Sequence, residues 1–73
     1  MGTNDFLTKL GRRIIEIRNE KGIRQIDLAI DSELDDGSLR RIEAGRTNPT
    51  VKTLIKIAKG LGVKTKDLLD FEE

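Results

Sequence analysis

Residues 24–43 constrain the fold most, because they contain two short amphipathic segments separated by a tight bend. Leu28 and Ala29 give the first segment an apolar face, and Leu39 and Ile42 give one to the second. Leu34 is the apolar residue of the bend between them. This pattern predicts two helices that bury their apolar faces against one common core.

The spacing is that of a helix-turn-helix motif, whose second helix can lie in the major groove of DNA. The outward face of this helix carries Asp36, Gly37, Arg40 and Arg41. An arginine can make a bidentate pair with guanine, which is worth about 1–3 kcal/mol of discrimination. The sequence therefore predicts base contacts from these four residues. Two alternatives stay open: a solvated Asp36–Arg40 ion pair worth under about 1 kcal/mol, and a Gly37 that is merely tolerated.

The chain has 73 residues and contains no cysteine or histidine. Disulfides and thiolate metal sites are therefore excluded, and the commonest general base and metal ligand are missing. We expect no enzyme activity, no metal, no cofactor and no small-molecule substrate. No apolar run approaches the roughly 18 residues that span a membrane, and no signal peptide is visible. A cytoplasmic location without a membrane partner is expected.

Apolar spacing predicts five short helices in an all-α domain over residues 1–73, with a core at about 5–70. The first helix is expected from Asn4 or Asp5, with Asn4 as N-cap, to the stop at residues 21–22, after loose residues at 1–4. The second and third are expected at about 25–32 and 36–43, the third capped by Asp35. Thr50 is expected to cap the fourth helix. Thr65 should cap a fifth helix that buries Leu68 and Leu69, before a loose end at 72–73.

The chain resembles the phage-repressor and Cro-like helix-turn-helix family, of the xenobiotic-response-element type. Its compact format is also similar to the small controller proteins of restriction-modification systems. The resemblance implies a five-helix bundle that binds double-stranded DNA as a homodimer, with the third helix in the major groove. The matching segments are Leu10-Gly11-Arg12-Arg13-Ile14, Arg18, Gly22-Ile23-Arg24-Gln25, Asp27-Leu28-Ala29, Arg41-Ile42-Glu43, Gly45, Asn48-Pro49, Thr53-Leu54, Ile57-Ala58 and Leu61-Gly62-Val63.

Gln25 opens the second helix, where members of this family use the equivalent glutamine on a phosphate or a neighbouring base. Its amide and the free N–H groups of the helix end suit a phosphate oxygen, although an ordinary polar helix start is the alternative. We expect further phosphate contacts from residues on the same side, which are Arg24, Arg46, Thr47, Asn48 and Lys52.

Arg18 and Glu43 match family positions that pair across the bundle. The resemblance implies that this pair ties the first helix to the end of the third. We therefore expect a structural ion pair that orients the third helix and does not itself read DNA.

The charge distribution argues against generic DNA binding. The 14 basic and 13 acidic residues give a net charge of only +1, and residues 24–46 hold four arginines against six acids, a formal charge of −2. Phosphate neutralisation supplies most non-specific affinity, so this segment should bind DNA poorly on charge alone. Glu33 stands where the family commonly has glycine, which indicates a side chain forced towards solvent or a wider turn. Asp36 could accept a hydrogen bond from cytosine, or repel the duplex.

Two functions remain. The first is a sequence-specific transcriptional regulator that binds a short palindromic operator as a homodimer. Its two copies are expected to meet through the fourth and fifth helices and the apolar tail from Val63 to Phe71, which includes Leu69. The second is a protein-interaction module of the same fold, such as an antitoxin or anti-regulator, with weak or no DNA binding. Ile15, Ile26 and Ile30 are expected to face outward, and the last two could form an apolar spot for a partner.

Overall fold

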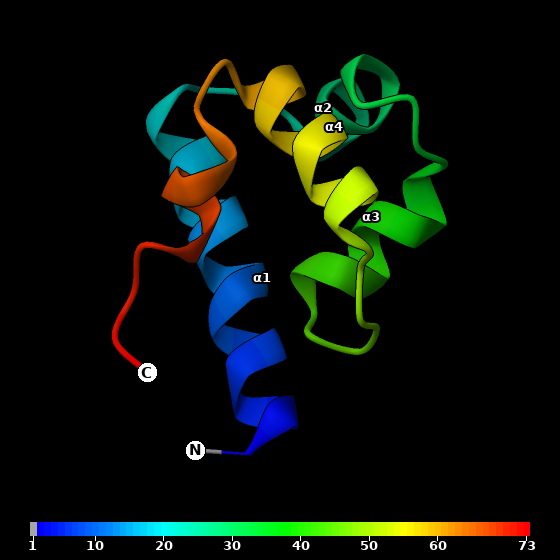
Figure 1. Ribbon diagram of the computed structural model, residues 1–73. Helices are drawn as coiled ribbons and strands as arrows, with labels where there is room; N and C mark the ends of the chain where they lie inside the picture. The colour runs from blue at the N-terminus through cyan, green and yellow to red at the C-terminus, as the bar shows by residue number, and fades with distance from the viewer. Residues whose placement is uncertain (1) are drawn as a thin grey trace.

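The structure is a computed structural model that describes residues 2–73, and these residues form an all-helical bundle (Figure 1). Four α-helices and one 3₁₀-helix follow one another: α1 (Thr3–Glu20), α2 (Gln25–Asp31), α3 (Asp36–Glu43), α4 (Val51–Leu61) and η1 (Thr65–Leu69). The all-α prediction is confirmed, although the fifth helix is a 3₁₀-helix. None of the described helices is long and apolar enough to cross a membrane.

The helices share one core because each presents an apolar stripe at a spacing of three or four residues. α1 packs against α3 and η1, whereas α2 and α4 pack against each other. Ile15 is half-buried and not outward-facing as expected, because α1 is covered on two sides. The buried hydrophobic residues are Leu10, Ile14, Ile17, Leu28, Ala29, Leu39, Ile42, Leu54, Ile57, Ala58, Leu61 and Leu68.

Two of the predicted helix caps are confirmed. The Asp35 carboxylate accepts the Ser38 N–H at 3.0 Å, and the Thr50 hydroxyl accepts the Thr53 N–H at 3.1 Å. α1 also ends as expected, because Gly22 follows it with a positive φ of 68°. These signals succeed because donor and acceptor lie only three residues apart in the sequence.

The other two predicted caps are wrong. Asn4 lies inside α1, because the Asp5 carboxylate accepts the Gly2 N–H at 3.4 Å and moves the cap back to Gly2. The start of η1 shifts likewise to Lys64, whose N–H donates to Asp67 at 3.0 Å.

Leu69 is 44% exposed, which corrects its predicted burial, while Leu68 is fully buried. Consecutive residues of a 3₁₀-helix point about 120° apart, so only one of two adjacent leucines can face the core.

The turn between α2 and α3 accommodates Glu33 in a left-handed conformation, with φ of 56° and the side chain exposed. The next N–H, of Leu34, donates back to the Ala29 carbonyl at 2.9 Å and closes the end of α2. The sequence predicts either a Glu33 side chain forced towards solvent or a wider turn, and the structure shows the side chain exposed to solvent. The turn sets the direction in which α3 leaves α2.

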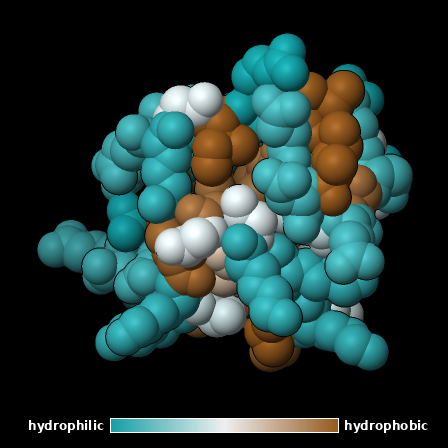
Figure 2. Space-filling view, turned by 90° about the horizontal axis from the view of Figure 1, so that it is seen from above, coloured by the Kyte–Doolittle hydropathy of each residue, from teal (hydrophilic) through white to brown (hydrophobic). Residues whose placement is uncertain are grey.

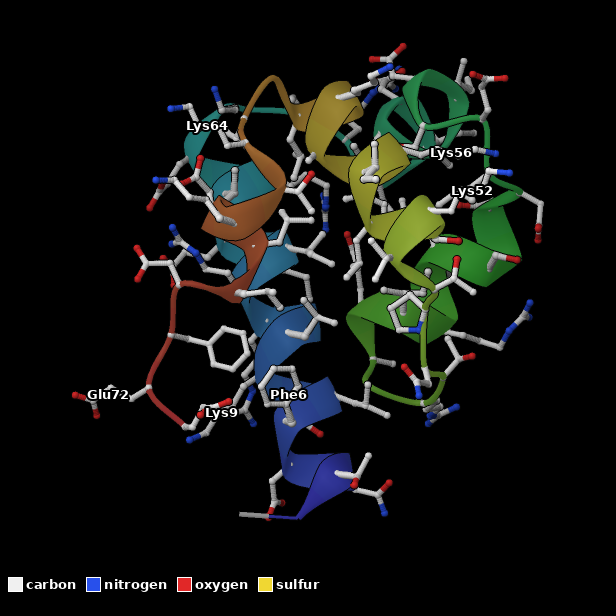
Figure 3. The ribbon with its side chains drawn as sticks, viewed as in Figure 1. Phe6, Lys9, Lys52, Lys56, Lys64 and Glu72 are labelled. Atoms are coloured by element: carbon white, nitrogen blue, oxygen red, sulfur yellow. The ribbon has the colours of Figure 1, made fainter. Side chains whose placement is uncertain are left out.

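The chain's last residues pack on α1. The Phe6 and Phe71 rings meet edge to face with centroids 5.1 Å apart, and Lys9 Nζ donates to the Glu72 carbonyl at 2.9 Å (Figure 3). The expected loose ends are therefore corrected at both sides: Thr3 and Asn4 belong to α1, and residue 72 is hydrogen-bonded. Met1 lies outside the described residues.

Gly11 sets how closely α1 and α3 approach. A Cβ at this position would lie 2.7 Å from the Ile42 carbonyl oxygen and closer still to that of Glu43. Because both are backbone atoms, Gly11→Ala forces the helices apart, and we expect it to lower the free energy of unfolding by about 1–3 kcal/mol. Urea unfolding measures this, with Arg12→Ala on the exposed face of α1 as control. Equal stability of Gly11→Ala and the control would contradict this close approach.

Candidate nucleic-acid interface

α3 presents one solvent-facing side, which carries the residues that the sequence predicted for base contacts. Its N-cap Asp35 fixes the first turn, and Leu39 and Ile42 hold its opposite side in the core. Asp36 and Gly37 are half-buried, and Arg40 and Arg41 are exposed. The structure therefore leaves both guanidinium groups accessible.

Arg40 pairs with Asp36 one turn earlier, with Nη2 and Oδ2 3.4 Å apart. The two side chains are 63% and 44% exposed, so water screens the pair and it contributes at most about 1 kcal/mol. A duplex could displace Asp36 from Arg40 at little cost.

Arg41 is held differently, by a neutral partner. Its Nη2 donates to the Ser38 hydroxyl at 3.2 Å, and that hydroxyl donates in turn to the Asp35 carboxylate. Ser38 was not among the residues singled out from the sequence. Its position three residues after the cap and three before Arg41 is the signal that could have identified it.

A shallow polar groove of about 220 Å³ lies beside Arg41. Thr47 and Asn48 from the α3–α4 loop line it, together with hydroxyl groups at the start of α4. The structure thus brings three predicted DNA contacts to one groove. The full lining is Leu34, Ser38, Arg41, Ile42, Thr47, Asn48, Pro49, Thr50 and Thr53.

The start of α2 is less free than predicted. Arg24 Nε donates to Asp27 Oδ2 at 2.8 Å, and this hydrogen bond raises the pKa of Arg24 and lowers the pKa of Asp27. The Gln25 amide donates to Glu43 Oε1 at 2.7 Å. A phosphate at Gln25 would therefore meet an amide whose N–H already has a partner inside the protein.

Glu43 is the centre of a buried polar cluster at the end of α3. Its carboxylate accepts Arg18 Nε at 2.9 Å and Nη2 at 3.2 Å, and Arg18 Nη1 also donates to the Ile23 carbonyl at 3.1 Å. The side chains of Arg18 and Glu43 are 15% and 4% exposed. The cluster joins α1, α2 and α3, and it withdraws one negative charge from the surface.

Two lysines add positive charge near α3. Lys52 was predicted, and Lys56 follows it by one turn; both extend from α4 on the side where α3 lies (Figure 3). Residues 24–46 without the buried Glu43 hold four arginines and five acids, so the formal charge of the remainder of this segment is −1. The i, i+4 spacing of Lys52 and Lys56 was the missed signal.

Arg46 lies in the loop after α3 with its side chain exposed, and its backbone N–H donates to the Arg41 carbonyl at 2.9 Å. No group of His, Cys, Asp and Glu side chains within residues 2–73 is arranged to hold a metal ion.

Ile26 and Ile30 on α2 are 51% and 67% exposed, as expected. α2 lies at the top of the bundle, and the view from above shows apolar surface between hydrophilic residues on this face (Figure 2).

The carboxylate of Asp35 accepts hydrogen bonds from the Ser38 hydroxyl and the Ser38 N–H, and these lower its pKa, with a smaller effect of the Arg41 charge. Because a lowered pKa stabilises the fold above the ordinary aspartate range, this stabilisation is present at neutral pH and is lost as pH falls through the lowered value. We expect the Asp35 carboxyl carbon to titrate at lower pH in the folded protein than in urea, by NMR. In Ser38→Ala the folded midpoint should rise, and an unchanged midpoint would contradict the assignment.

A helix-turn-helix with an accessible second helix and a polar groove at its end defines the class of the molecule. The chain belongs to the helix-turn-helix family, whose sequence pattern matches residues 14–68. This confirms the resemblance that the sequence indicated.

Among its relatives, control protein C.BamHI of Bacillus amyloliquefaciens is 37% identical over 70 residues, covering 94% of this chain and 86% of the relative. The transcriptional regulator DdrOP3 of Deinococcus deserti is 39% identical over 62 residues, or 85% of this chain, which spans only 48% of that protein. The crystal structure of the restriction-modification controller protein C.AhdI from Aeromonas hydrophila matches with a TM-score of 0.83 at 34% identity, over 85% of this chain and 94% of the other.

Proposed function

We propose that this protein is a transcriptional regulator that binds double-stranded DNA sequence-specifically, as a homodimer on a short palindromic operator. The observation that carries the proposal is the exposed face of α3, which carries Arg40 and Arg41, with Arg41 beside a groove rich in hydroxyl groups. The names of the relatives, a transcriptional regulator and a control protein, support a regulatory role.

In this proposal α3 enters the major groove. An α-helix with its side chains is about 10–12 Å in diameter, which suits a major groove about 12 Å wide. Arg40 and Arg41 would pair with guanine, Asp36 would accept from cytosine N4, and Gly37 would let the backbone come close to the bases.

Contacts to phosphates would flank α3 on both sides. Arg24, Arg46, Thr47, Asn48 and Lys52 would hold phosphates without reading sequence, and Gln25 would do so with the N–H that does not donate to Glu43. Lys56 would add to the attraction.

The dimer would form through an apolar face at the start of α4. Val51 and Ile55 on α4 are 69% and 43% exposed, and Leu69 on η1 is 44% exposed. Leu69 also lines a groove of about 500 Å³, mainly with Phe6, Leu7, Leu10, Pro49 and Leu54. Phe71, which the sequence assigned to the dimer, instead packs on Phe6 of its own chain. A two-fold axis at this face would place two copies of α3 about one helical turn of DNA apart.

Ile55→Lys is expected to convert the dimer to monomer, because it places a charge in an apolar interface. Analytical ultracentrifugation measures the change, and circular dichroism checks that the helices persist. Ile30→Lys, also on an exposed isoleucine but on α2, should remain dimeric. Dimers of both variants would contradict the α4 interface.

The proposed function is tested by selection from a random duplex library with the intact protein. We expect enrichment of a palindrome, and a binding constant for it that falls steeply with salt concentration because phosphates are neutralised. A folded, dimeric sample that enriches no sequence would overturn the proposal.

The second candidate is the protein-interaction module, favoured by the exposed Ile26 and Ile30 beside the acids of α2. It predicts weak duplex binding with a flat salt response, and a partner interaction that Ile30→Lys abolishes.

A further inference from the structure

Ser38 is half-buried in the first turn of α3, three residues after the cap Asp35 and three before Arg41. Its N–H and its hydroxyl both donate to the Asp35 carboxylate, so its side chain has one fixed orientation. The same hydroxyl accepts Arg41 Nη2 at 3.2 Å. A chain of hydrogen bonds therefore runs from the helix cap to the guanidinium.

Gly37 provides the space for this arrangement. A Cβ at residue 37 would lie 3.3 Å from Arg41 Nη1, which is slightly tighter than ordinary contact, and 3.4 Å from Asp35 Oδ2. The guanidinium thus lies back along the helix over the position where Gly37 has no side chain. Gly37 therefore has a role in placing Arg41 and is not merely tolerated in the helix.

We infer that Ser38 and Gly37 are positioning residues that hold the Arg41 guanidinium in one orientation before DNA binds. The inference rests on the proposed function, in which Arg41 contacts a base edge. Arginine has large rotamer freedom, and ordering it in advance removes a cost that binding would otherwise bear.

The partner of Arg41 also suits this role. Arg40 is paired with a carboxylate in a weak, screened ion pair that DNA binding must still break, whereas Arg41 is anchored by a neutral hydroxyl. Its other N–H groups can then meet the two acceptors of guanine without first breaking an ion pair. Of the two arginines, Arg41 is the one prepared for recognition.

The first test uses the free protein and needs no DNA. Nitrogen-15 NMR relaxation of the arginine side chains should show Arg41 Nε more ordered than Arg40 Nε. Ser38→Ala should reduce the order of Arg41 to the level of Arg40, and Ser38→Thr should restore it, because threonine keeps the hydroxyl. Equal order in the parent and in Ser38→Ala would overturn the inference.

The second test measures affinity for the selected operator and for random duplex. Ser38→Ala should weaken operator binding about three- to tenfold and leave random-duplex binding unchanged. The loss should fall on the same base pair that Arg41→Ala affects, and adding Ser38→Ala to Arg41→Ala should cost nothing further.

Gly37→Ala is expected to stabilise the fold and to weaken binding to the operator. Alanine is the better helix former, so the melting temperature should rise by about 1–5 °C. Because the guanidinium must shift by a few tenths of an ångström to admit the methyl group, operator binding should weaken about three- to tenfold. If Gly37 had only a structural role, its replacement by alanine would not raise the melting temperature and weaken operator binding together.

The two proposals fail in different ways. A parent protein that selects no operator overturns the proposed function and this inference together. A parent that selects an operator, and a Ser38→Ala variant that binds the same base pairs equally well, overturn the inference alone.

Discussion

Replacing Glu43 by alanine is expected to lower the free energy of unfolding by about 3–5 kcal/mol. The substitution leaves the largely buried Arg18 guanidinium and the Gln25 amide without their common acceptor. Folded domains are stabilised by only about 5–15 kcal/mol, so the variant should lose a large share of its stability. Urea unfolding followed by circular dichroism measures the loss.

A double-mutant cycle separates the ion pair from its surroundings. Arg18→Ala/Glu43→Ala should lose much less than the sum of the single variants, because neither charge then remains buried alone. Glu20→Ala, an exposed glutamate on the same helix as Arg18, should change stability by no more than about 0.5 kcal/mol. If Glu43→Gln kept full stability but abolished DNA binding, Glu43 would belong to recognition and the structural assignment would be wrong.

Replacing Arg40 and Arg41 together by alanine is expected to weaken binding to the selected operator about 30-fold or more. Two half-sites each lose at least one bidentate guanine contact, and each such contact is worth about 1–3 kcal/mol. Both side chains are exposed, so the melting temperature should change little. Fluorescence anisotropy with the operator and with random duplex at one salt concentration measures the ratio.

The matched control is Arg12→Ala/Lys64→Ala, which also removes two positive charges from exposed positions. Lys64 lies across the bundle from Lys52 and Lys56 (Figure 3). The control should lose only the small long-range attraction, equally for operator and random duplex. An arginine double variant that binds the operator as tightly as the control would exclude Arg40 and Arg41 from base recognition.

The sequence by itself determined the helices and several of their ends. Ile14 and Ile17 repeat at helical spacing, and Asp35 and Thr50 stand three residues before the N–H groups that they accept. These signals are local, and both partners of each hydrogen bond lie in one short segment. Two caps were misplaced because Asp5 and Asp67 also compete for nearby N–H groups, and sequence spacing does not rank such competitors.

Part of the candidate site could also be predicted, since a helical repeat puts Arg40 and Arg41 on the solvent side once Leu39 and Ile42 are inside. Whether these residues bind DNA stays a prediction. The pairing of Arg18 with Glu43 was indicated by family resemblance, because 25 residues separate them and no local pattern relates them.

Only the tertiary structure decided the remaining features. The Gln25 amide meets Glu43 because α2 and the end of α3 are packed together, and Gly11 is needed because α1 crosses the backbone at residues 42 and 43. The groove beside Arg41 is lined by residues from two helices and a loop, and the burial of Glu43 removes one negative charge from the surface. Such contacts depend on how helices cross and at what distance. That geometry is fixed by the packing of the whole core, whereas a helix and its cap are fixed by neighbours along the chain.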